Sequence, residues 1–403
     1  MDDAAGAFHV SECHGRVQRW QSAMGREGLD AVLLTTPADV FYITGFLTRF
    51  WESPARPWFV VVPVSGQPVA VIPSIGAAVM ARTWVSDIRT WDAPDPHDDG
   101  VTLLGETLRE LSPKNGRIGL PMGLETHLRM PLADFNKLCR DIAPRTICDA
   151  TQAVQRTREV KSDAEIARIR RTCAIADAAF ASVPDIAKPG RPLEQIFRDF
   201  QAALLHAGAD WVSYLAGAAG PCGYGDVISP ADSRPLAHGD VLMLDTGAVK
   251  NGYFCDFDRN FFVGPPSLAL LQTHTALWDA TDDVITQLRP GMTAQDVHKM
   301  LWDGLRERGV VPCEGRLGHG LGITLTEWPS FTPKDTTELR AGMVLTIEPS
   351  AYVDGQMFLT HEENIVLRDT GAELLSKRAP RASDLPPFVR SCLASDHRRI
   401  ECA

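Results

Sequence analysis

The chain has 403 residues, of which 44% are hydrophobic and 23% charged, an ordinary composition for a globular protein with room for two domains. Its formal net charge of −11 argues against nonspecific binding of nucleic acid or an anionic membrane and is compatible with a cation site. No stretch approaches the roughly 20 apolar residues of a membrane span, and the polar N-terminus lacks the apolar core of a signal peptide.

Helical and strand patterns alternate over residues 1–155, which predicts an α/β domain. No GxGxxG or Walker motif occurs in it, so the pattern does not indicate nucleotide binding. Helices are expected at His14–Glu27, Ile75–Thr83, Val101–Leu111 and Met130–Cys139, and strands at 31–35, Trp58–Val64, Pro68–Ile72, Ile88–Trp91 and Arg117–Leu120.

A second domain is expected over residues 156–376, followed by a polar, proline-rich tail at 377–403 that we expect to be disordered. The segment Ala216–Pro235 is rich in Gly, Pro, Ser and Asp, which predicts irregular structure. Helices are expected at Arg156–Val183, Leu193–Ala207, Leu268–Gln287 and Thr293–Gly309, and strands at Met343–Ala351 and His361–Leu367.

The stretch Val241–Val263 predicts a β-hairpin, because two apolar runs flank an Asn-Gly turn signal at residues 250–252. Asp245, Asp256 and Asp258 stand where a core strand normally has apolar residues. Folding the hairpin places Asp245 roughly opposite Asp256, and buried acids are normally paired or hold a metal. A solvated hairpin with polar tips is the alternative interpretation.

Three later motifs carry further candidate ligands: GHGLG contains His319, TIEP ends on Glu348, and HEEN contains Glu362. Each alone has an ordinary explanation as surface polarity. Together with the two hairpin acids they form a set of four carboxylates and one imidazole without a thiolate. Such a set suits two hard or borderline divalent cations, such as Mn²⁺, Co²⁺, Fe²⁺ or Zn²⁺.

These pieces resemble the pita-bread metallohydrolases of peptidase family M24, which include methionine aminopeptidase, aminopeptidase P, prolidase and creatinase. The similarity runs over roughly residues 156–370 and is carried by LDTGAVKNGYFCDFDRNF, GHGLG, TIEPS and HEENIVL. FYITGF at 41–46 is similar to the creatinase-type N-terminal domain. The resemblance implies an α+β fold, in which an α/β N-terminal domain precedes a duplicated α+β catalytic domain with an antiparallel sheet, and it implies a homodimer.

By resemblance, Asp256 and Glu362 would bridge two divalent metal ions per chain. Asp245 would complete one metal, and His319 and Glu348 the other. The implied activity is that of a hydrolase of the Xaa-Pro dipeptidase type, which cleaves an amide C–N bond with a metal-bridging hydroxide while Glu348 acts as general base.

Three positions depart from the family's peptidases. A second His follows the glycine-flanked His by seven residues in those enzymes, and here that position is Thr326. The Arg two residues before the bridging Glu is Thr360, and the His 17 residues before the first Asp is Ile228. Groups that grip a peptide are therefore missing, and substrate choice in such pockets depends on a few placed polar groups.

Several side chains near these positions are candidates to replace the missing groups, and each also has an ordinary structural explanation. His361 is a candidate proton shuttle, although strand alternation points it away from the metal face. The candidate catalytic residues are Glu348, Thr326 and His361. The candidate substrate contacts are Tyr224, Asp226, Asp258 and Trp328, with Trp51 of the N-terminal domain reaching a partner subunit's site.

Two other functions stay open at this point. A member of the same fold without peptidase activity would act on a small solute, as ectoine hydrolase, creatinase or a sulfoniopropionate lyase does. A non-enzymatic binding module is the third hypothesis, which the intact ligand set and the acidic charge oppose. The expected partner is a small molecule or short peptide, with no nucleic acid and no membrane. Nine scattered Cys without a CxxC motif suit reduced thiols in a cytoplasmic enzyme.

Overall fold

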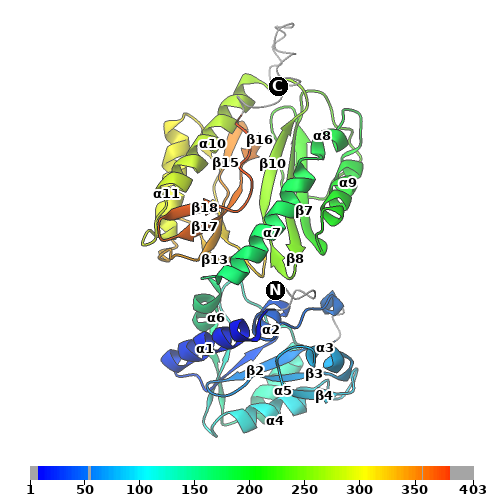
Figure 1. Cartoon of the computed structure of the whole chain (residues 1–403), viewed down its shortest axis with the longest axis vertical. Coiled ribbons are helices and arrows are strands. Elements are labelled where there is room, and N and C mark those ends of the chain that lie inside the picture. The colour runs from blue at the N-terminus through cyan, green and yellow to red at the C-terminus, as the bar shows by residue number, and fades with distance from the viewer. Residues whose placement is uncertain (1–7, 53–55, 356, 382–403) are drawn as a thin grey trace. The chain divides into compact units, whose positions relative to one another are not determined.

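The computed structural model describes residues 8–52, 56–355 and 357–381. Their contacts divide the chain into two compact units, Met1–Arg158 and Glu159–Ala403 (Figure 1). Most of the predicted tail, residues 382–403, lies outside the described residues, whereas residues 377–381 are placed against the second unit through Lys377, Arg378 and Ala379.

The first unit is built on a six-stranded mixed sheet in the order β4-β3-β2-β1-β5-β6 (Figure 1). Its strands are β1 Ala31–Leu34, β2 Phe59–Pro63, β3 Val69–Pro73, β4 Asp87–Trp91, β5 Arg117–Leu120 and β6 Thr146–Asp149. Its helices are α1 Val10–Glu27, α2 Pro37–Thr44, α3 Ala77–Met80, α4 Val101–Leu111, α5 Leu132–Asp141 and α6 Thr151–Arg158, with short 3-10 turns η1 Phe50–Glu52 and η2 Ser74–Gly76.

Helices cover both faces of this sheet, which explains why its central strands are apolar at every position. Ala31 and Leu33 of β1 pack in one core with Leu104 and Leu108 of α4. The alternate residues point to the opposite face, where α1 packs against β2. The predicted strand pair β2–β3 is confirmed. The short strand β6 was not predicted, because two of its four residues are exposed, the other two are half-buried, and the strand carries little apolar signal.

The second unit contains helices and three antiparallel sheets. Its helices are α7 Asp163–Phe180, α8 Val183–Ile186, α9 Leu193–His206, α10 Leu268–Gln287 and α11 Ala294–Glu307. Its first sheet has the order β10-β8-β7, with β9 beside β8, and comprises β7 Trp211–Gly220, β8 Val241–Lys250, β9 Tyr253–Phe254 and β10 Phe257–Phe262. The others are β11-β15-β16 and β13-β12-β14-β17-β18, with β11 Val311–Pro312, β12 His319–Gly320, β13 Glu327–Ser330, β14 Val344–Ile347, β15 Ser350–Asp354, β16 Met357–Thr360, β17 Glu363–Arg368 and β18 Gly371–Leu374.

The second unit has two halves of similar construction. In the first half α7 and α9 pack on β7 and β8, and in the second half α10 packs on α11, β15 and β18 (Figure 1). Each half therefore pairs helices with a sheet, and the sheets of the two halves meet between the helix layers. This arrangement places the hairpin β8–β10 beside β17 (Figure 1).

The predicted helix Arg156–Val183 is confirmed over Asp163–Phe180, which form α7, but it does not begin at Arg156, because the chain leaves the helical conformation at residues 159–162. Val160 pairs with Met343 as an isolated bridge, and the Lys161 N–H donates to the Gly342 carbonyl. Helix α7 then begins with a capping box, in which the Ser162 and Glu165 side chains each accept from the other residue's backbone N–H. Tertiary pairing of residues 160–161 thus overrides helical periodicity.

Part of the segment predicted as irregular is also ordered. Strand β7 extends through residues 216–220, which pair with Val241–Asp245 of β8. The composition of this stretch, AGAAG, is poor in strand-forming residues, and its neighbour β8 supplies the pairing that the local sequence does not favour. Residues 221–235 consist of turns and short bridges, as predicted.

The hairpin between β8 and β10 is confirmed, but its register differs from the predicted one. Asn251 and Gly252 both have positive φ, so the turn has two residues and Lys250 pairs with Tyr253. Asp245 is consequently opposite Asp258. The predicted partner of Asp245 was Asp256, two residues earlier in the chain. Because side chains alternate between the faces of a sheet, a shift of two residues leaves Asp256 on the same face.

Six cysteines of the described chain have free thiols: Cys13, Cys139, Cys148, Cys173, Cys255 and Cys313. Within residues 8–52, 56–355 and 357–381, no helix has the length and apolar character needed to cross a lipid bilayer.

Candidate metal centre

The structure brings the five predicted ligands together from the β8–β10 hairpin and from three later segments of the second unit. Asp245 lies in β8, and Asp256 lies between β9 and β10. His319 lies in β12, while Glu348 and Glu362 flank the ends of β14 and β17. Each ligand therefore sits on or beside a hydrogen-bonded strand, which gives the site a rigid frame.

His319 is oriented by its own backbone neighbourhood. Its N–H donates to Thr346 Oγ1 at 3.1 Å, which ties β12 to β14. Its Nδ1 lies 2.8 Å from the Gly320 carbonyl oxygen, an acceptor, so Nδ1 carries the ring proton. The lone pair of Nε2 then faces the acids, with Asp256 Oδ2 at 3.4 Å and Glu348 Oε2 at 3.9 Å. This is the tautomer that a metal ligand needs.

Glu348 and Glu362 face each other across the β14–β17 ladder. Ile347 pairs with Glu363, and the same register extended by one residue sets Glu348 opposite Glu362. The predicted continuous strand Met343–Ala351 is interrupted at Pro349, so β14 ends just before Glu348. The Glu348 side chain is 28% exposed, which places it at the open side of the pocket.

The acids lie in a buried cluster that fits a bound cation. One ligand atom each from Asp256, His319 and Glu362 lies within 4.8 Å of the others. Asp245 Oδ1 and Glu362 Oε1 are buried without a hydrogen-bond partner among the described residues, and so is Asp258 Oδ1. Unpaired buried carboxylate oxygens are costly unless a cation compensates them, so these residues fit divalent metal.

Loss of hydration raises the pKa of all four acids. Burial raises the pKa of Asp256 to about 8 and that of Glu348 to about 7. The pKa values of Asp245 and Glu362 are also well above the usual range, first because of burial and then because neighbouring carboxylates repel. Without a cation, these acids resist ionisation because their negative charges are buried close together. Such raised pKa values are expected at a site where bound cations normally compensate the charges.

Two further side chains of the site were not predicted. The phenol of Tyr214, in β7, donates to the Val227 carbonyl at 3.4 Å, and burial together with the charges of Asp245 and Asp256 raises its pKa. Arg316 is exposed, and its charge lowers the pKa of both Asp256 and Glu348. Tyr214 was missed because no strand was predicted where β7 lies, whereas Arg316 stands three residues before His319, just ahead of the GHGLG motif.

The predicted substrate contacts near the hairpin have different environments. Asp258 is buried opposite Asp245, accepts from Asn260 Nδ2 at 3.2 Å and adds a further carboxylate to the pocket. Tyr224 is buried in an apolar cluster, and its hydroxyl is engaged by Asn260 and by the Thr360 N–H. Asp226 is exposed and caps a turn through the N–H groups of residues 228 and 229. The structure therefore brings only Asp258 to the ligands.

The remaining candidates lie around β13 and β17. Thr326 is half-buried, and its carbonyl accepts from Thr324 Oγ1. Trp328 is half-buried in β13, which pairs with the His319 strand. His361 is buried, and its Nε2 lies 2.8 Å from Arg378 Nη1. His361 thus points toward Arg378, as alternation from Glu362 predicts, and it is not placed to shuttle protons at the metal cluster.

Trp51 belongs to the first unit, where it lies in η1. Its ring packs against Phe46 and Trp58, and the Arg129 guanidinium lies 5.0 Å from the ring centroid. At two of the departures from the family's pattern, Thr360 is buried with its hydroxyl 2.8 Å from Ser350 Oγ, and Ile228 is 80% exposed. None of these side chains supplies an imidazole or a guanidinium to the cluster.

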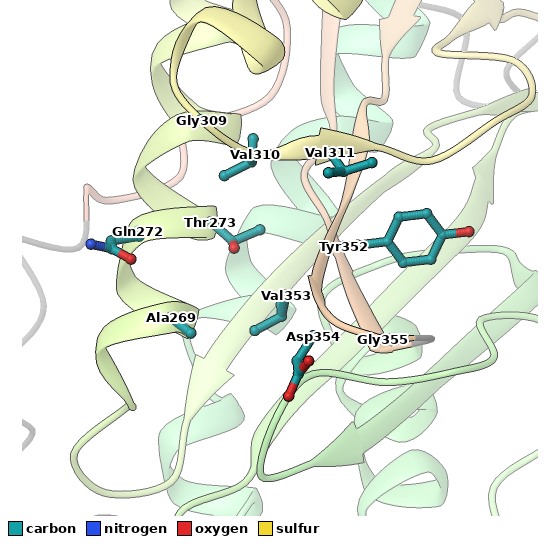
Figure 2. A pocket seen from close by; sticks show the side chains of 10 residues that line it. All are labelled: Ala269, Gln272, Thr273, Gly309, Val310, Val311, Tyr352, Val353, Asp354 and Gly355. Carbon is teal, nitrogen blue, oxygen red and sulfur yellow. The ribbon is translucent and has the colours of Figure 1, made fainter. Parts of the chain in front are cut away.

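A separate hollow of about 390 Å³ opens between α10, β11 and β15 (Figure 2). Gln272 and Thr273 border it from the helix, and Tyr352 and Asp354 border it from β15 (Figure 2). Among the described residues that line it, Asp354 is the single acid, and none of the five predicted ligands takes part. This hollow therefore lacks the donor set of the metal cluster.

The fold and the cluster define a class: a two-part protein whose C-terminal unit is built to hold divalent metal between duplicated sheets. The model of metallopeptidase family M24 matches residues 167–369, and that of the creatinase/prolidase N-terminal domain matches residues 16–160. The chain belongs to metallopeptidase family M24. It is a hydrolase of that peptidase type, and membership implies dependence on divalent metal. The fold that the sequence resemblance implied is confirmed.

Relatives span nearly the whole chain. The probable dipeptidase PepE of Mycobacterium tuberculosis is 26% identical over 358 residues, which cover 87% of this chain and 91% of that protein. The crystal structure of dipeptidase PepE from Mycobacterium ulcerans superimposes with a TM-score of 0.80 and 27% identity, and covers 93% of this chain and 98% of that one. A recombinant prolidase from Thermococcus sibiricus shares the fold, with a TM-score of 0.81, 23% identity, and coverage of 91% and 97%.

Proposed function

We propose that this protein is a metal-dependent dipeptidase of the Xaa-Pro type, which hydrolyses the amide bond of short peptides with two divalent cations. The observation that carries the proposal is the buried cluster of Asp256, His319 and Glu362, whose ligand atoms lie within 4.8 Å of one another. The dipeptidase and prolidase relatives support the reaction class.

We assign each of the five side chains a role in binding the cations. Asp256 and Glu362 lie at the centre and would bridge them, Asp245 would complete one coordination sphere, and His319 Nε2 with Glu348 would complete the other. When bound, such a pair of cations lowers the pKa of a shared water so that it acts as nucleophile near neutral pH. Glu348 lies at the open side of the pocket, where its carboxylate would accept a proton from the nucleophile and pass it to the leaving amine.

A dipeptide also carries a C-terminal carboxylate, which calls for a cationic group at the pocket mouth. Arg316 supplies one: its charge acts on Asp256 and Glu348, and the neighbouring Leu317 carbonyl accepts from the Glu348 N–H at 3.0 Å. A guanidinium pairs with a carboxylate through two parallel hydrogen bonds. Arg316 would therefore favour short peptides with a free C-terminus, in a pocket without the family's usual Arg and second His.

The test is hydrolysis of an Xaa-Pro dipeptide panel by Mn²⁺-loaded protein, with ectoine and creatine assayed in parallel. We expect dipeptides to be cleaved, and turnover of the solutes alone would contradict the proposal. Arg316→Ala should raise KM for a free dipeptide at least tenfold and leave kcat within about threefold, because it removes ground-state binding. The same dipeptide with a C-terminal amide is the control, and its KM should not change.

We further propose, from the family resemblance, that Mn²⁺ is the working metal and that the enzyme is a cytoplasmic homodimer. Metal analysis of protein purified without chelator would identify the ion. Sedimentation equilibrium would give the mass in solution, and a monomer at micromolar concentration would contradict the dimer.

A further inference from the structure

We propose that Asn364 and Arg259 are positioning residues that hold the two bridging acids of the metal centre at a fixed separation. The inference rests on the proposed function, because it concerns the cation pair that Asp256 and Glu362 would share. These two acids lie on opposite sides of a seam, which we define as residues 256–260, leading into β10 and including its start, and residues 360–364, leading into β17 and including its start.

The seam joins strands of two different sheets. Strand β10 is the outer strand of the β10-β8-β7 sheet, whereas β17 lies between β14 and β18 in the five-stranded sheet. The two strands nonetheless lie in contact. The hydrogen bonds that cross between them come from side chains, so the spacing of Asp256 and Glu362 depends on those side chains.

Asn364 makes the first of these connections. Its Oδ1 accepts from the Asp256 N–H at 3.0 Å, and its Nδ2 donates to the Asp256 carbonyl. One side-chain amide thus satisfies both backbone groups of a predicted bridging ligand, as a neighbouring strand would do. Asn364 is itself fully buried and pairs in register with Thr346, whose hydroxyl accepts from the His319 N–H. It therefore links Asp256 to the strand that orients His319.

Arg259 makes the second connection. Its Nη1 donates to the Asp258 carbonyl at 2.6 Å and to the Glu362 carbonyl at 2.8 Å, which fixes the backbone of the other bridging ligand. Its Nη2 donates to Glu363 Oε2 at 2.9 Å and to the Lys377 carbonyl. The planar, multi-donor guanidinium is suited to holding several acceptors at once, which an ammonium group cannot reproduce.

A buried ion-pair network keeps Arg259 in place. Glu363 is fully buried between Arg259 and Arg378, and Arg378 Nη1 donates to Glu363 Oε1 at 3.2 Å. The Ser376 hydroxyl and the Ala379 N–H also donate to the Glu363 carboxylate. A buried carboxylate with this many donors is well compensated, so the guanidinium of Arg259 has little freedom to leave the seam.

The test measures Mn²⁺ binding to metal-free full-length protein by calorimetry, and the magnetic coupling of the bound pair by electron paramagnetic resonance. Asn364→Ala and Arg259→Lys should each weaken Mn²⁺ binding by about 10- to 100-fold, as for other groups that orient metal ligands. The exchange-coupled signal of the pair should weaken or change in both variants, because the separation of the two bridging carboxylates is altered.

Val284→Ala is the matched control, because Val284 of α10 is fully buried in an apolar cluster that contains none of the seam residues 256–260 and 360–364. It should lower the thermal midpoint while Mn²⁺ affinity and coupling stay at wild-type values. Unchanged Mn²⁺ affinity and coupling in either seam variant would overturn the positioning role. A wild-type protein that binds no Mn²⁺ pair would instead overturn the proposed function. If Asn364→Ala does not fold, the Mn²⁺ affinity and coupling of Arg259→Lys test the positioning role, because lysine retains the charge and most of the volume of arginine.

Discussion

At the scale of single residues, the carboxylates of the metal cluster are unfavourable for the stability of the metal-free protein and are the groups that would bind the cations. Asp245, Asp256, Glu348 and Glu362 crowd negative charge into a pocket that strips their hydration, and this raises the pKa of each. Such an arrangement destabilises the metal-free protein and becomes favourable when cations bind. Stability and metal binding should therefore respond in opposite directions to the removal of one acid.

Asp256→Asn tests this opposition. The amide has nearly the same size but no charge, so we expect the metal-free variant to gain roughly 1–2 kcal/mol of stability by relief of like-charge repulsion. Its Mn²⁺ content and peptidase activity should fall to background. Elemental analysis and thermal denaturation in EDTA measure the two effects. Asp303→Asn, which changes an exposed acid on α11, is the control and should keep its metal. Two metals per chain in Asp256→Asn would refute the ligand assignment.

His274 predicts a loss of stability in acid. It is buried against the rings of Phe262 and His361, and burial together with the charge of Arg378 lowers its pKa from 6.5 to about 4. Between these values the unfolded chain binds the proton and the folded chain does not. Stability is therefore complete above about pH 6.5 and is lost as the pH falls toward 4, by roughly 2 kcal/mol between pH 7 and pH 5.

The variant His274→Phe should remove this share of the acid sensitivity, because a phenyl ring fills the same apolar site and takes up no proton. Urea unfolding at pH 7 and pH 5 measures the difference. Leu277→Ala, one helical turn away in α10, should lower stability equally at both pH values. If His274→Phe loses as much stability in acid as the wild type, the histidine is not responsible.

The sequence was informative about the five predicted metal ligands and less informative about the other side chains of the site. The five ligands are recognisable because carboxylates and an imidazole stand in apolar strands and in a glycine-rich motif, where a core would not otherwise place them. Tyr214 and Arg316 carry no such contrast, since a Tyr in a strand and an Arg in a loop are ordinary. Tyr224 and Asp226 were selected by chain proximity to the hairpin, and proximity along the chain did not bring them to the pocket.

At the scale of elements, the glycine-rich segment before β12 shows how backbone geometry positions a ligand. Gly318 has φ +137°, which favours glycine, and a Cβ there would meet the Thr346 carbonyl and the Phe331 ring. This close approach lets the His319 N–H reach Thr346 Oγ1. The absence of a side chain at residue 318 is thus part of what aims the imidazole.

Gly318→Ala should push this segment away from β14 and displace His319. We expect a loss of about 1–3 kcal/mol in stability from backbone strain, and at least a tenfold loss of Mn²⁺ affinity. Gly309→Ala is the matched control, because Gly309 also has positive φ, at +77°, but nothing lies within 4 Å of an added Cβ. It should lose stability and keep its Mn²⁺ affinity. Equal Mn²⁺ affinity in both variants would contradict the role of Gly318.

Elements were predicted well where local signals are strong and poorly where tertiary pairing decides. Helix α10 has the predicted bounds Leu268–Gln287, and the Asn-Gly turn forms as predicted. The predicted helix Arg156–Val183 starts later than expected, at Asp163, because residues 160–161 pair with residues 342–343, far along the chain. Part of the error in the hairpin register has a local cause, since a three-residue turn was assumed where Asn251 and Gly252 suffice, and this shifts the pairing by one residue.

At the scale of the whole molecule, the catalytic unit is a duplicated construction whose centre depends on both halves. Asp245 and Asp256 come from the first half, and His319, Glu348 and Glu362 come from the second. The sequence motifs predict this convergence through their order. They do not predict the seam contacts of Asn364 and Arg259, because those residues read as ordinary polar and charged positions next to ligands.

Because all five predicted ligands belong to the second unit, removal of the metal should affect the two units differently. The ligands come from separate segments of residues 159–381 and none comes from the first unit, so cations should stabilise the second unit alone. Binding to the folded state at a Mn²⁺ concentration of 100 times Kd would add about 2.7 kcal/mol. Hydrogen exchange should therefore slow in β12, β14 and β17 by up to about 100-fold when Mn²⁺ replaces EDTA.

Strands β1 and β2 of the first unit are the internal reference for the same experiment, and their exchange should not depend on Mn²⁺. The variant Glu362→Ala supplies the second control, because it lacks a predicted bridging carboxylate and should exchange equally fast with Mn²⁺ and with EDTA. Equal protection of β1 and β17 by Mn²⁺ would mean that the cation acts on the whole protein rather than through these ligands. Protection of β17 that persists in Glu362→Ala would place the stabilising cation outside the cluster.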